Sequence, residues 1–91
     1  MTPKQISELF KDEIVRRINI NKSDLIRYGV DQDYLMEKCN ISNHKKEARR
    51  AMQLLKNQNI IYYDKHDAVW MVESEWIKNI IELQERLRKH E

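Results

Sequence analysis

Residues 43–72 read NHKKEARRAMQLLKNQNIIYYDKHDAVWMV, and the spacing of their apolar residues changes midway. In the first half, apolar residues recur at the three- and four-residue spacing of one helix face: Ala48, Ala51, Met52 and Leu55. Further along, apolar residues become consecutive and β-branched or aromatic at 60–63 and 68–72, with the polar segment 64–67 between them. We therefore predict a helix that Asn43 caps and that runs to about Gln58, followed by a β-hairpin.

The residues before this stretch have the pattern of a long helix followed by a short turn. Apolar residues at helical spacing are Ile6, Leu9, Phe10, Ile14, Val15 and Ile18. Thr2 is suited to cap this helix, which we predict over 3–20. Ser23-Asp24 is expected to cap one short turn that ends at Tyr28. Gly29 is expected to end this turn, because glycine adopts positive φ without strain.

Two further helices complete the expected order of elements. Asp31 or Asp33 is predicted to cap a second helix that carries Leu35, Met36 and Cys39. Asn40 follows it, a residue that tolerates the left-handed conformation of a tight exit. Ser74 is predicted to cap a last helix over 74–90. The fold class expected is mainly α with one β-hairpin, in a single domain spanning 1–91.

Length and composition exclude several classes of protein. The chain has 91 residues with one Gly, so phosphate-binding loops that need several glycines are excluded. Its one Cys excludes an internal disulfide framework. No 18-residue apolar run predicts a membrane span, and the first residues do not resemble a signal peptide. We therefore expect a reduced, cytoplasmic setting. The net charge of +2 does not by itself indicate a type of partner.

Two segments resemble the winged helix-turn-helix superfamily of DNA-binding proteins. Residues 48–61, ARRAMQLLKNQNII, are similar to a recognition helix that leads into the first wing strand, with Met52 in place of the usual Leu and Asn59 in place of Gly. Residues 35–42, LMEKCNIS, resemble the preceding helix and turn, with Asn40 where Gly is typical. The region 42–47 is about two residues longer than the family pattern.

The resemblance spans 35–72 and implies roles for the two parts of the chain within it, and the residue patterns outside it predict roles for the other two. Residues 2–30 would be an N-terminal helix and short turn, 31–58 the helix-turn-helix, 60–72 the wing, and 74–90 a dimerisation helix. The resemblance further implies a compact, autonomous regulator of the kind common in viruses, plasmids and prokaryotes. Its location would be the cytoplasm, associated with the nucleoid or within a host cell.

The charge distribution supports binding to nucleic acid. Residues 43–58 carry five Lys or Arg and one Glu, a local charge of +4. Such a face gains affinity for DNA by releasing condensed counterions, and Arg, Asn and Gln can also read base edges. We predict a double-stranded DNA-binding protein, most simply a transcriptional regulator. The expected DNA contacts are Asn43, His44, Lys45, Lys46, Arg49, Arg50, Gln53, Lys56, Asn57 and Lys65.

Three other interpretations of the basic face stay open. It can be a solvated helix face with no partner. The same fold can also dock another protein, as a host-factor inhibitor or a component of a replication complex. Binding to structured RNA is the third alternative. A steep salt dependence of DNA retention would separate DNA binding from protein docking.

The last helix has a three-four apolar repeat typical of a two-stranded seam. We predict a homodimer through Trp76, Ile77, Ile80, Ile81, Leu83 and Leu87. Two recognition helices would then reach half-sites one turn of DNA apart, ~34 Å. The alternative is a terminal helix that folds back on the core of its own chain.

The sequence indicates no catalytic or metal chemistry. Cys39 and His44 are too few for a zinc site, and Cys39 is best interpreted as a small buried hydrophobe. Trp70 and one of Tyr62 and Tyr63 are expected in the core, and neither tyrosine has partners for nucleophilic chemistry. Acidic pairs near helix starts are explained by capping. We expect no enzyme activity, cofactor or metal.

Overall fold

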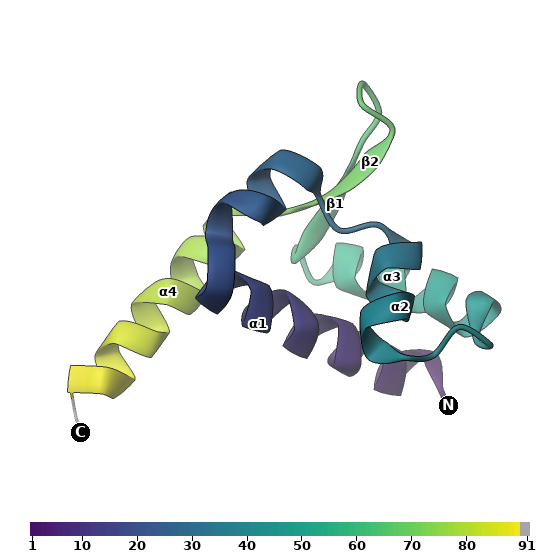
Figure 1. The fold of residues 1–91 in the computed structure, drawn as a ribbon, viewed down its shortest axis with the longest axis horizontal. Coiled ribbons are helices and arrows are strands. Elements are labelled where there is room, and N and C mark those ends of the chain that lie inside the picture. The colour runs from purple at the N-terminus through teal and green to yellow at the C-terminus, as the bar shows by residue number, and fades with distance from the viewer. Residues whose placement is uncertain (90–91) are drawn as a thin grey trace.

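The computed structural model describes residues 1–89, which form four helices and one two-stranded antiparallel hairpin (Figure 1). The elements are α1 (Pro3–Tyr28), α2 (Gln32–Cys39), α3 (Lys45–Asn57), β1 (Ile61–Asp64), β2 (Val69–Val72) and α4 (Ser74–Lys89). The expected class, mainly α with a β-hairpin, is confirmed. Residue 90, the last of the predicted final helix, lies outside the described residues. No helix within residues 1–89 combines the length and apolarity that crossing a membrane requires.

The core forms where α1 runs beneath α2 and α3 (Figure 1). One apolar face of α1 is buried there: Ile6, Phe10, Ile14 and Ile18. Leu9, which shares the helical spacing, lies at the edge of this face and is exposed. The predicted inner face of α3 is fully confirmed, since Ala48, Ala51, Met52 and Leu55 are each at most 1% exposed. Burial of these two faces is the main apolar stabilisation of the fold.

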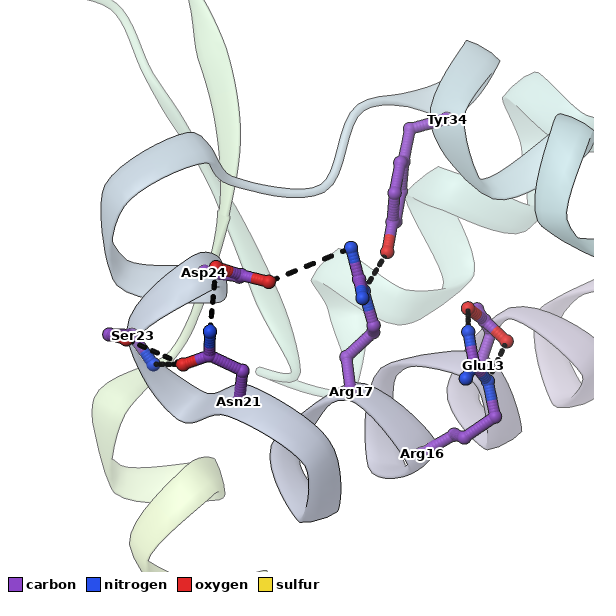
Figure 2. A network of polar contacts seen from close by, with 7 residues as sticks. All are labelled: Glu13, Arg16, Arg17, Asn21, Ser23, Asp24 and Tyr34. Atoms are coloured by element: carbon purple, nitrogen blue, oxygen red, sulfur yellow. Dashed lines mark hydrogen bonds and ion pairs between the residues drawn. The ribbon is translucent and has the colours of Figure 1, made fainter.

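α1 is longer than predicted because the helix restarts after a kink. We expected the first helix to end near Ile20 and Ser23-Asp24 to cap a separate turn. Instead Asn21 leaves helical geometry, with φ −159° and ψ 93°, and the helix resumes as far as Tyr28. The Asn21 side-chain oxygen accepts hydrogen bonds from the backbone N–H of Ser23, at 3.2 Å, and from its hydroxyl (Figure 2). Asn21 therefore performs the capping that the sequence assigned to Ser23-Asp24.

A polar network fixes this kink against α2 (Figure 2). Arg17, before the kink, lies 3.7 Å from a carboxylate oxygen of Asp24, after it. The same guanidinium donates a hydrogen bond to the Tyr34 hydroxyl on α2 and lies 5.6 Å from the centre of the Tyr34 ring. One turn earlier, a hydrogen bond from Arg16 lowers the pKa of Glu13. Arg17 thus joins both parts of α1 to α2.

Gly29 and Val30 hold the connection between α1 and α2 against the hairpin. The Val30 N–H donates to the carbonyl oxygen of Trp70 at 2.8 Å, so the connection lies along β2. Gly29 has φ +75°, and a Cβ there would collide with that carbonyl and lie 2.7 Å from Val69 Cγ2. The expectation that Gly29 ends the helix at positive φ is confirmed.

Both ends of α2 lie where the sequence predicts them, whereas the start of α3 does not. Asp31 caps α2 by accepting a 2.7 Å hydrogen bond from the Tyr34 N–H. Asn40 has φ 57° and ends α2 in the left-handed conformation. The predicted cap of α3, Asn43, was wrong: His44 occupies the cap position, without a side-chain hydrogen bond, and α3 begins at Lys45.

The turn of the hairpin lies one residue later in the chain than predicted, whereas β2 ends at Val72 as expected. The strands pair from Ile61↔Val72 to Asp64↔Val69, so the turn comprises 65–68 and not 64–67. Asp64 explains this shift, because its carboxylate accepts hydrogen bonds from two backbone N–H groups inside the turn. Asn59, at φ 60°, makes the left-handed exit from α3 that the sequence indicates.

α4 begins with Ser74 inside the helix. The predicted cap at Ser74 was wrong, since the carbonyl oxygen of Glu73 accepts the first hydrogen bond, from Ile77 N–H at 3.1 Å. The Glu73 N–H in turn donates to the carbonyl oxygen of Ile60 at 2.9 Å. α4 starts beside the kinked part of α1 and then runs away from the body (Figure 1).

Candidate nucleic-acid interface

α3 presents a polar, basic face on the side opposite its buried face. The predicted contact residues on this helix are all exposed: Lys45, Lys46, Arg49, Arg50, Gln53, Lys56 and Asn57. This arrangement follows from the 100° step of the helix, because fixing Ala48 and Leu55 in the core leaves the polar positions in solvent. The helix therefore displays five cations with a rigid backbone behind them.

These cations have no ion-pair partner among the side chains that the structure describes. The acidic residue within α3, Glu47, lies 4.0 Å from His44 Nδ1 and forms no ion pair with a lysine or arginine of its own helix. Cations elsewhere do pair, as Arg16 does with Glu13 at 2.6 Å. No ion pair within the described side chains therefore engages the positive charge of α3, which favours an anionic partner.

An open groove of about 780 Å³ runs beside this face. It is lined by four cations of α3, by Asp31, Gln32 and Asp33 at the start of α2, and by Trp70 of β2. Gln32 joins the two walls, because its side-chain amide donates to the carbonyl oxygen of Lys45 at 3.2 Å. The groove is therefore a mixed-charge site in which cations outnumber carboxylates.

The turn before α3 holds two of the other three predicted contacts. Asn43 is exposed in the turn, and His44 is half-buried at the helix start beside Glu47. Both lie next to the first cation of the helix, Lys45. The structure thus brings the predicted contacts of 43–57 together on one side of α3.

The predicted contact on the hairpin lies apart from the groove. Lys65 is exposed at the hairpin tip, which projects from the body, and it is not among the groove residues (Figure 1). Its neighbour Asp64 uses its carboxylate to hold the turn. Lys65 can therefore reach only a ligand that extends beyond α3.

The aromatic residues of the hairpin only partly match the sequence interpretation. Trp70 is half-buried and packs against the core, as expected. Tyr62 and Tyr63 are 39% and 44% exposed, so the expectation that one of them is buried was wrong. Tyr63 instead packs edge-on against Trp70, its partner on the opposite strand, with ring centres 5.3 Å apart.

Asp31, Asp33 and Trp70 are groove residues that the sequence did not assign to a site. The sequence explains both aspartates by helix capping, and Asp31 does cap α2. Their second role depends on how α2 packs beside α3, which no local pattern in the sequence indicates. The one sequence signal of this role is that 31–33 is acidic and 45–50 is basic.

Cys39 packs against the core, as expected of a small hydrophobe at this position, but it is half-buried and not fully buried. Its thiol lies 3.6 Å from the carbonyl oxygen of Leu9, at the edge of the contact between α1 and α2. This burial raises the pKa of the Cys39 thiol, and the nearby Glu13 and Asp12 raise it further. No group of three or more potential ligand residues suited to a metal lies within residues 1–89.

The apolar residues of α4 divide into two sets. Ile77 is 2% exposed inside the core of its own chain, and Trp76, Ile80 and Ile81 pack partly against that core. Leu83 and Leu87 are 50% and 60% exposed. The first half of α4 therefore packs on its own chain but leaves Trp76 and Ile80 only partly covered, and the second half leaves its leucines in solvent.

Comparison of the chain with protein-family models, with curated proteins and with solved structures found no match in any of the three. The functional interpretation therefore rests on the surface of α3 and its surroundings.

Proposed function

We propose that this chain is a winged helix-turn-helix protein that binds double-stranded DNA and regulates transcription. The observation that carries the proposal is the exposed, unpaired basic face of α3. A straight helix with one buried and one cationic face suits the major groove, which is wide enough to admit it. In this proposal α3 is the recognition helix.

The arrangement of the elements supports the same proposal. α2, a left-handed exit at Asn40, and α3 follow in the order of a helix-turn-helix, and the hairpin comes directly afterwards. The hydrogen bond from Val30 to Trp70 holds the connection between α1 and α2 beside the hairpin. The projecting hairpin would serve as the wing, with Lys65 at a phosphate.

The chemistry of each side chain suggests its role. Arg49 and Arg50 can donate two hydrogen bonds to guanine, and Gln53 and Asn57 can pair with adenine. The lysines of α3, with Asn43 and His44 at its start, are suited to phosphate oxygens, which position the helix. Phosphate contacts supply affinity, and the arginine and amide side chains supply sequence preference.

The proposal includes a homodimer through α4. Its exposed leucines support this part, whereas Ile77 is already occupied within its own chain. A dimer would present two α3 helices to one DNA molecule, and a symmetric pair of half-sites would follow.

A salt titration of DNA binding tests the proposal. The logarithm of the association constant for a fluorescent duplex is expected to fall linearly with the logarithm of salt concentration. If all five cations of α3 contact phosphates, the slope contributed by one chain is about −4.5, since each contact adds about −0.9. Retention that does not change with salt, or the absence of binding at low salt, would reject DNA binding.

One observation favours a protein partner as the second candidate. Asp31 and Asp33 lie in the same groove as the cations of α3, and carboxylates there repel phosphates. A protein surface that carries both charges would match this groove. In that case a partner protein would bind in the groove, and duplex DNA would fail to displace it.

A further inference from the structure

The second half of α4 is an apolar surface that its own chain leaves uncovered. Leu83 and Leu87 are 50% and 60% exposed, and every described residue from Glu85 onward is exposed. This half runs away from the body (Figure 1). It nevertheless continues the apolar seam of Trp76 and Ile80, which packs on the core at its beginning. An apolar seam that extends beyond the core of its own chain indicates a partner for α4.

The charges along α4 indicate which partner fits. Residues 73–82 carry three glutamates and one lysine, whereas 83–89 carry one glutamate and three basic residues. A second copy in antiparallel orientation would place the basic half of one helix beside the acidic half of the other. Parallel copies would place like charges side by side, which costs free energy.

We propose that α4 pairs with α4 of a second copy in antiparallel orientation, with Glu75 of each chain beside Arg86 of the other. This inference rests on the proposed self-association and not on DNA binding. In the register that sets Trp76 level with Leu87 of the second copy, Ile80 is level with its Leu83. The exposed leucines of each chain would then be covered by the seam of the other.

The placement of Glu75 and Arg86 follows from the helix geometry. At 100° per residue the two side chains lie about 20° apart around the axis, on the flank of the seam away from Ile77 and hence away from α1. In the antiparallel register Arg86 of the second copy lies two residues, ~3 Å, from the level of Glu75. In a parallel pair the same two residues would be separated by eleven residues, ~16 Å.

Charge reversal separates the two orientations. Sedimentation equilibrium is expected to show a dimer for the full chain, with Leu83→Lys giving a monomer. Glu75→Arg and Arg86→Glu should each weaken the dimer roughly tenfold, because each exchanges two attractions for two repulsions. The double variant should return to within about twofold of the original dissociation constant. Glu85→Lys, on the far side of α4, is the matched control and should leave the dimer unchanged.

Two outcomes would overturn the inference. A dimer in which the double variant is as weak as the single variants rejects the antiparallel pairing. A full chain that stays monomeric at millimolar concentration, with normal circular dichroism, rejects self-association through α4. Duplex binding is measured on the same samples. A monomer that binds DNA with a steep salt slope would leave the proposed DNA binding standing without its dimer, whereas a dimer that fails to bind would reject only the DNA binding.

Discussion

Replacing Arg49 and Arg50 together by Ala tests the assignment of α3 most sharply. Both side chains are exposed and line the groove beside α3, and no ion pair holds either among the described side chains. Their removal lowers the charge of 43–58 by two and leaves the buried face intact. If each makes one phosphate contact, the salt slope becomes less steep by about 1.8. At about 0.15 M salt the affinity for duplex DNA falls roughly 30-fold by the same rule.

The assay is fluorescence anisotropy of a labelled duplex at several salt concentrations. The double variant Arg88→Ala and Lys89→Ala is the matched control, because it removes two exposed cations at the far end of α4 (Figure 1). It should change the slope by less than the α3 variant does. Thermal melting followed by circular dichroism should be the same for both variants, since exposed substitutions rarely alter stability by more than ~0.5 kcal/mol.

Two results would refute this reasoning. If the α3 variant keeps both the affinity and the slope of the original chain, the basic face of α3 is not the DNA-binding surface. If both variants weaken binding equally, DNA is attracted by overall charge and α3 has no special role.

Three further predictions concern the fold. Gly29→Ala should destabilise the chain by about 1–3 kcal/mol in urea unfolding, because the positive φ is strained with a side chain and the new Cβ meets Val69 and the Trp70 carbonyl. Asp31→Ala should cost ~1 kcal/mol in the same assay through loss of the α2 cap. Alkylation of Cys39 should reach its half-maximal rate at a higher pH than that of a free thiol, since burial raises its pKa.

The sign of the Cys39 effect on stability follows from the same shift. The folded chain binds the thiol proton more tightly than the unfolded chain does, so this contribution to stability is complete below the unfolded pKa. It is lost as pH rises through the raised, folded pKa. A Cys39→Ser chain provides the control, because it should lack this alkaline loss. A Gly29→Ala chain of unchanged stability, an uncapped α2 of equal stability, or alkylation with the pH profile of a free thiol would each contradict the corresponding prediction.

Local patterns in the sequence predicted the parts of the fold that local physics determines. The inner face of α3 follows from its apolar spacing, and Ala48, Ala51, Met52 and Leu55 are buried as expected. Asn40 and Asn59 take the left-handed conformation, since a short amide side chain tolerates it where glycine is commonest. The Asp31 cap is local as well.

Features that depend on tertiary contact were not predictable in this way. The helix continues past Asn21 because its side chain caps the next turn and Arg17 ties Asp24 to α2, a contact between distant elements. The groove places Asp31 and Asp33 opposite the cations of α3 through the packing of α2. Tyr63 stays exposed because the hairpin extends past the core, and strand alternation alone does not reveal where a core ends.

The most direct test of DNA binding by α3 is a map of backbone amide shifts by nuclear magnetic resonance as duplex DNA is added. DNA binding by α3 predicts the largest changes over 43–57, a smaller change at Lys65, and little change at the buried face of α1 or at the end of α4. Changes confined to α4 or to the exposed face of α1, with α3 unaffected, would contradict it.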